Sequence, residues 1–148
     1  MSDDVADPLK LIAFDAEDLA VLSAHLQDAV LKIGDIVFLP AERRFALAVR
    51  RFDWDGVQAG HTRRRLTALH FERVTAARST KIDAAAPDAV LNLLAITFGE
   101  TQSPAGFVTL HFSDGGAIRL DVECVEAQMK DLGPVWEAAS APDHSDGA

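Results

Sequence analysis

The spacing of hydrophobic positions changes several times along the chain. An apolar run at residues 9–14 predicts a short strand. Asp15 follows in the position of a helix N-cap, because its carboxylate can accept a hydrogen bond from a free amide of the first turn. Leu19, Leu22 and Leu26 then recur at helical spacing. We therefore expect a strand at 9–14 and a helix that continues to about residue 29.

Beyond residue 30 the apolar positions alternate with a period of two, which is typical of strands. A turn at 40–42 separates two alternating runs of equal parity, and this parity predicts a hairpin in which Phe38 faces Phe45. A further strand is expected at 63–74, paired back on the previous one through a loop at 53–62. That register sets Phe45 opposite Phe71 and brings Arg44 to Glu72 as an opposite-charge pair.

The C-terminal half contains a predicted loop at 79–88, an apolar strand at 90–98 and a hairpin of residues 107–112 and 117–124. The core pattern favours a three-residue loop that sets Phe112 opposite Ile118, with a glycine in the left-handed position. The expected buried face consists of Leu110, Phe112, Ile118, Leu120 and Val122, and Cys124 continues it as a small core residue. Residues 125–132 are predicted to form a short helix ended by Gly133-Pro134.

These elements predict an α+β fold with a mostly antiparallel sheet, or a partly open barrel, of about seven strands. One early helix and one C-terminal helix complete it. Seven strands followed by a helix is also the element count of a pleckstrin-homology-like domain, although the helix after the first strand departs from that pattern. We expect a flexible N-terminus at 1–8, a single domain at 9–137 and a disordered tail at 138–148.

Composition and charge narrow the class of protein. The chain has 148 residues, 49% of them hydrophobic, and a net charge of −9. An acidic protein is an unfavourable partner for nucleic acid, whose phosphates attract positive charge. The longest uncharged run, 101–113, is too short to span a membrane, and the acidic N-terminus is unlike a secretion signal. These features predict a cytoplasmic protein with no membrane partner.

Positive charge is concentrated between residues 43 and 81, where ten basic residues accompany three acidic ones. Guanidinium groups bind phosphate or carboxylate in bidentate fashion, and aromatic rings offer a stacking surface. The candidate anion- or partner-binding residues are Arg50, Arg51, Trp54, His61, Arg63, Arg64 and Arg65. The alternative is a structural ion-pair network in which these arginines meet Asp53, Asp55 and other carboxylates of the chain.

The sequence contains no catalytic motif, and we expect no catalytic residue, metal or cofactor. His61 with Asp53 and Asp55 is the best metal candidate, but these loop residues are too scattered for ligand spacing. A non-enzymatic binding or adaptor module is therefore the favoured interpretation, with an anionic ligand or an acidic protein surface as its partner. The alternative is a small enzyme or metabolite-binding protein for a phosphorylated or carboxylate ligand.

Five segments carry a resemblance to a known family: residues 9–13, 43–47, 51–54, 69–71 and 131–136. Over about residues 9–137 the chain resembles a small alphaproteobacterial domain family of unknown function. The resemblance implies a bacterial protein and brings no activity that could be transferred.

Overall fold

The computed structural model describes residues 8–54 and 63–137, the last four of them by their backbone alone. These residues form one helix and ten strands, together with three short 3-10 turns. The helix is α1 (Ala16–Leu26). The strands are β1 (Lys10–Ala13), β2 (Ala29–Lys32), β3 (Ile36–Leu39), β4 (Arg44–Phe52), β5 (Arg63–Phe71), β6 (Val74–Thr80), β7 (Val90–Glu100), β8 (Gly106–Phe112), β9 (Ala117–Val122) and β10 (Ala127–Glu137).

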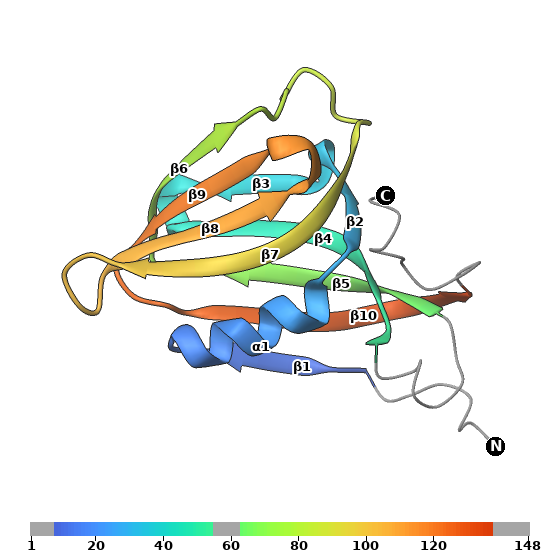
Figure 1. Cartoon of the computed structure of the whole chain (residues 1–148), viewed down its shortest axis with the longest axis horizontal. Coiled ribbons are helices and arrows are strands. Elements are labelled where there is room, and N and C mark those ends of the chain that lie inside the picture. The colour runs from blue at the N-terminus through green and yellow to red at the C-terminus, as the bar shows by residue number, and fades with distance from the viewer. Residues whose placement is uncertain (1–7, 55–62, 138–148) are drawn as a thin grey trace.

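All strand pairs are antiparallel, in the order β1-β10-β5-β4-β2-β7-β8-β9-β6, and β3 pairs with β4 outside this path. Figure 1 shows the sheet bent around its interior, so that β7, β8 and β9 lie across from β4, β5 and β10. Helix α1 packs against β7 and β1 with Leu19, Leu22 and Leu26 buried. The apolar core therefore lies inside the bend of a single sheet.

The predicted fold class is wrong, because the described residues form ten strands and one helix instead of seven strands and two helices. The expected helix at 125–132 is the start of β10, which pairs with β1 on one side and β5 on the other. Ala127 and Met129 point into the core and alternate with Gln128, which is a strand pattern. Gly133-Pro134 does not end a helix but lies within the register shift between Asp131 and Val135.

Two further expectations at this level are wrong for related reasons. Residues 74–80, predicted to end a strand and begin a loop, form the edge strand β6 paired with β9. The element count of a pleckstrin-homology-like domain also fails, because the chain ends its described part in a strand and not in a helix. The architecture is predominantly antiparallel β with one early helix.

The predicted registers around β4 are confirmed. Phe38 faces Phe45, and Phe45 faces Phe71 across the next pair. On the outer face Arg44 Nε donates to Glu72 Oε2 at 2.8 Å. The N-cap is also confirmed, because the Asp18 amide donates to Asp15 Oδ1 at 2.8 Å.

In the β8–β9 hairpin the buried face is as predicted, but the loop is longer. The five apolar residues expected inside are buried. His111 pairs with Ala117, so the three-residue loop with Phe112 opposite Ile118 is wrong and the register is shifted by two residues. A 3-10 turn at Ser113–Gly115 fills the connection, with Asp114 and Gly115 in the left-handed region at φ 63° and 80°. A shift of two residues preserves which side chains face the core.

Among the described residues, no helix has both the length and the hydrophobicity that crossing a membrane requires.

Candidate functional site

The alternation that builds the core continues into arginine at one end of β4 and β5. On β4 the inward positions run Phe45, Leu47, Val49 and then Arg51. On β5 they run from Phe71 and Leu69 back through Thr67 to Arg65 and Arg63. Because side chains alternate strictly between faces along a strand, these three arginines point into the molecule.

Arg51 forms a bidentate ion pair with Asp131 of β10. Its Nε and Nη2 donate to the two carboxylate oxygens at 2.9 and 2.7 Å, and the two side chains are only 1% and 2% exposed. Thr67 Oγ1 donates to Asp131 Oδ1 at 2.7 Å, and the Leu9 amide donates to Oδ2 at 2.8 Å. Burial alone would raise the pKa of Asp131. The hydrogen bonds from Arg51, Leu9 and Thr67 outweigh it, so that the pKa lies below its usual value.

Asp53 lies beside the other two buried arginines. Arg65 Nε donates to Asp53 Oδ2 at 3.3 Å, whereas Arg63 Nη2 is 4.0 Å from the same oxygen. The Arg63 side chain is 9% exposed, and its Nε and Nη2 are buried without a hydrogen-bond acceptor in the described part of the chain. We call Arg51, Arg63, Arg65, Asp53 and Asp131 the inner arginine cluster. Within this cluster, Arg63 is the residue whose hydrogen-bond donors are incompletely satisfied.

The remaining arginines lie on the opposite face of the same strands. Arg64 Nη1 donates to the carbonyl oxygens of Asp28 and Arg50 at 3.2 and 3.1 Å, and its guanidinium carbon is 5.8 Å from the Phe52 ring centroid. Burial lowers the pKa of Arg64, and the charge of Asp28 opposes this. Trp54 packs edge-on against Phe52 and donates from Nε1 to the Gln27 carbonyl at 3.2 Å. On this face, backbone carbonyls and aromatic rings are therefore the partners of the Arg64 and Trp54 side chains.

The seven candidate residues therefore do not form one patch. Arg51, Arg63 and Arg65 meet inside, while Arg64 and Trp54 belong to the outer face and Arg50 is exposed. His61 lies outside the described residues. Asp131 and Thr67 were not among the predicted residues. Parity was a usable signal for Thr67, because Thr67, Arg65 and Arg63 share the phase of the core residues Leu69 and Phe71.

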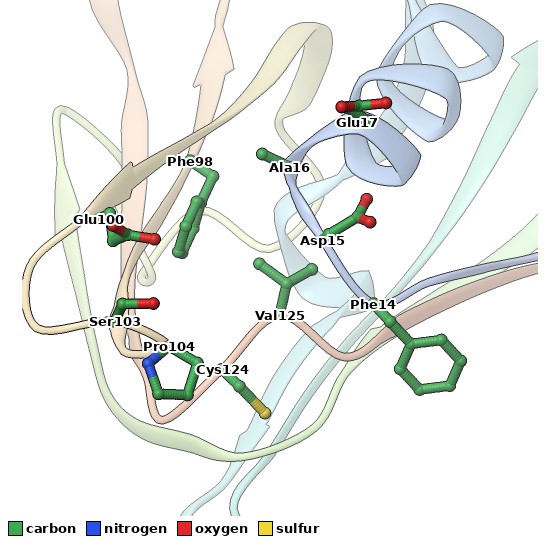
Figure 2. Close-up of a pocket in the computed structure, with 10 residues that line it drawn as sticks. All are labelled: Phe14, Asp15, Ala16, Glu17, Phe98, Glu100, Ser103, Pro104, Cys124 and Val125. Carbon is green, nitrogen blue, oxygen red and sulfur yellow. The ribbon is translucent and has the colours of Figure 1, made fainter.

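A hollow of about 350 Å³ lies where the start of α1 meets the end of β7 and the segment after β9. Figure 2 shows Phe98 and Val125 facing this space and Phe14 pointing away from it. Glu17 and Glu100 give it an acidic lining, and Cys124 lines it instead of lying in the core as predicted. Within the described ranges it holds no buried polar side-chain atom that lacks a partner, unlike the inner arginine cluster.

Comparison with known proteins adds a family and no activity. Among the described residues no three His, Cys, Asp or Glu side chains are grouped as metal ligands would be. Neither the curated proteins nor the solved structures contain a match to this chain. A family model described as "Protein of unknown function (DUF2948)" matches residues 9–144, as the resemblance in sequence predicted. The chain therefore belongs to this domain family of unknown function.

Proposed function

We propose that the chain is a non-enzymatic binding module in which the inner arginine cluster holds one anionic group, a carboxylate or a phosphate, of a ligand or partner. The observation that carries the proposal is Arg63, whose Nε and Nη2 are buried without a hydrogen-bond acceptor among residues 8–54 and 63–137. A buried charged donor that lacks an acceptor costs free energy, because the desolvation of the group is not compensated. An oxyanion placed beside it would accept both hydrogen bonds.

The charge balance of the cluster supports this proposal. Three guanidinium groups share two carboxylates among the described residues, and Arg51 bonds to both oxygens of Asp131, which also accept hydrogen bonds from Thr67 and Leu9. Arg63 is the first residue of β5, so it lies at the end of the strand, away from the apolar core residues Leu69 and Phe71. A guanidinium is suited to this task because its planar fork matches the geometry of carboxylate and phosphate.

Binding is favoured over catalysis by the chemistry of the cluster. Arginine does not deprotonate in proteins, so it cannot serve as a general base. Asp131 already accepts four hydrogen bonds and has a lowered pKa, which suits a fixed counter-charge better than a group that exchanges protons. The cluster can thus fix a negative charge in place.

The test compares thermal unfolding in potassium phosphate and in potassium acetate with unfolding in potassium chloride at equal ionic strength. We expect the parent melting temperature to rise by several degrees in phosphate, acetate or both, because a ligand of the native state stabilises it by mass action. Arg63→Met should lose this rise. Arg78→Met is the matched control, because Arg78 is a largely exposed arginine on β6 whose loss removes the same charge.

A further arm adds poly-glutamate at the same ionic strength. Protection by poly-glutamate alone would identify the anion as part of an acidic protein surface, and protection by phosphate or acetate would identify a small ligand. An equal rise in Arg63→Met and in the parent would contradict the proposal, as would a parent that none of the three anions protects.

A further inference from the structure

The edge strand β1 leaves backbone groups free for pairing. In the described part of the chain it pairs only with β10. The Asp131 amide donates to the Leu9 carbonyl at 2.9 Å, so the backbone groups of Leu9 face β10. Since these groups alternate in direction along an antiparallel strand, those of Lys10 and Ile12 face the open edge. The Phe14 amide has the same parity, and the Asp18 carboxylate accepts from it at 3.1 Å.

The same edge exposes large apolar side chains. Ile12 is 48% exposed and Phe14 is 66% exposed. The other end of the sheet, β6, has no large hydrophobic residue of comparable exposure, and its exposed positions carry Thr75, Arg78, Ser79 and Thr80. Native edge strands are normally protected against pairing with another chain, and exposed apolar side chains reduce this protection at β1.

The charges along β1 are arranged with opposite signs at its two ends. Lys10 is exposed at the beginning of the strand, and its register partner Lys130 is exposed beside it. Asp18 is held at the far end through its bond to the Phe14 amide. A positive beginning and a negative end are complementary only to a strand that runs in the opposite direction.

We propose that β1 is a self-association surface, on which a second copy of this chain pairs antiparallel about a two-fold axis at Ile12. The two Ile12 residues then lie opposite each other and exchange backbone hydrogen bonds. Lys10 of each copy lies opposite Phe14 of the other, next to the Asp18 carboxylate. The contact is isologous, as a two-fold dimer requires, and it joins the two sheets into one. Parallel pairing would instead place Lys10 against Lys10.

The experiment is sedimentation equilibrium of the full chain over protein concentrations up to about 1 mM. We expect a reversible dimer, because a contact of one short strand is smaller than a standard protein interface. Ile12→Lys places like charges together at the axis and should raise the dissociation constant at least about tenfold. Val37→Lys is the matched control, because Val37 is 45% exposed on β3, away from β1.

A charge exchange tests the direction of pairing. Lys10→Glu and Asp18→Lys should each weaken the dimer, and the double variant should restore it, because it swaps the signs at both ends. Circular dichroism checks the fold of each variant, and the surface change Lys10→Glu carries the test if Ile12→Lys does not fold. A parent that stays monomeric would overturn the proposal. So would a dimer insensitive to Ile12→Lys and Lys10→Glu, or a double variant weaker than both single variants.

Discussion

Strands β4 and β5 keep one register along their whole length, but the residues that they bury differ in kind at the two ends. At one end Phe45 faces Phe71, with their ring centroids 6.5 Å apart. At the other end Arg51 faces Arg65, and Asp53 and Asp131 compensate their charge. The backbone hydrogen bonding is the same at both ends, so the difference lies in the side chains alone.

The two ends are stabilised in different ways. Apolar burial is non-directional and depends on area and on filled volume. A buried ion pair depends on every donor having an acceptor, since losing one partner leaves an uncompensated charge. The apolar end is therefore complete in itself, whereas the inner arginine cluster keeps unmet bonding capacity at Arg63. A site for an anion from a ligand or partner is therefore expected at the arginine end of the two strands.

The largest expected effect on stability comes from removing one partner of the bidentate pair between Arg51 and Asp131. Arg51→Met should lower the free energy of unfolding by about 3–5 kcal/mol, because Asp131 is left buried without its counter-charge. Phe71→Ala at the apolar end should cost a similar amount, about 3–5 kcal/mol, through the cavity that it leaves. Urea unfolding at neutral pH measures both.

A second substitution separates the two losses. The double variant Arg51→Met with Asp131→Leu should be more stable than Arg51→Met alone, because it removes the orphaned carboxylate. Adding Asp131→Leu to Phe71→Ala should lower stability further. Equal responses of the two single variants to Asp131→Leu would show that the ends do not differ in the way described.

The next effect is a dependence on pH. The pKa of Asp131 is lowered in the folded protein, so the unfolded chain binds the proton more readily. The stabilisation from ionised Asp131 is therefore fully present above the unfolded pKa of about 3.9. It is lost as the pH falls through the lower folded pKa. The gap in stability between parent and Asp131→Asn should narrow from pH 7 to pH 3.

The comparison with Asp131→Asn is needed because Glu72 also titrates in this range. Burial alone would raise the pKa of Glu72, but hydrogen bonds from Arg44 and His70 lower it overall. Glu72 is present in both proteins, so its contribution cancels in the difference. A gap that stays constant over this pH range would contradict the assigned role of Asp131.

A smaller effect of opposite sign is expected at Arg63. In chloride, Arg63→Met should leave stability unchanged or raise it by about 1 kcal/mol, because it removes buried donors that have no acceptor. Arg51→Met under the same conditions is the contrasting case. A loss of several kcal/mol in Arg63→Met, measured by urea unfolding, would mean that Arg63 is satisfied within the chain.

The smallest effect is expected outside the cluster, at the exposed pair of Arg44 and Glu72. Nearly half of the Arg44 side chain is exposed, so water and salt screen the pair. Arg44→Ala should leave the urea midpoint unchanged within experimental error, although the pair raises the pKa of Arg44. A clear shift of the midpoint would show that pairing on the outer face matters as much as burial.

Parity made part of the sheet predictable from the sequence. The pairing of Phe38, Phe45 and Phe71 follows from equal parity around turns, and so does the buried face of β8 and β9. Parity does not determine loop length, so the β8–β9 register was missed by two residues. Parity also assigns a face to a residue whatever its side chain. For the arginines in a core phase the sequence left open a binding site or an ion-pair network, and their burial was not predicted.

Non-local contacts set the limit of prediction. Local chemistry at Gly133-Pro134 favours the end of a helix, but β10 gains partners on both sides from strands more than fifty residues away in the sequence. The pairing of Asp131 with Arg51 depends on this placement, and single-sequence spacing carries no signal for it. The arginines of the cluster and the carboxylate of Asp53 could be named from the sequence, but not the inward orientation of the arginines or the pairing of Arg51 with Asp131.

The position of β10 also has a consequence for the order in which the chain can fold. β10 is the last strand of the described residues in sequence but lies between β1 and β5 in the sheet. On a growing polypeptide, β5 has a bare edge and Arg51 lacks the carboxylate 80 residues ahead of it until this strand has been synthesised. Closing such long loops is slow, and unpaired edges expose the intermediate to aggregation. Insertion of β10 then covers the edge of β5 and neutralises the buried arginine in one step.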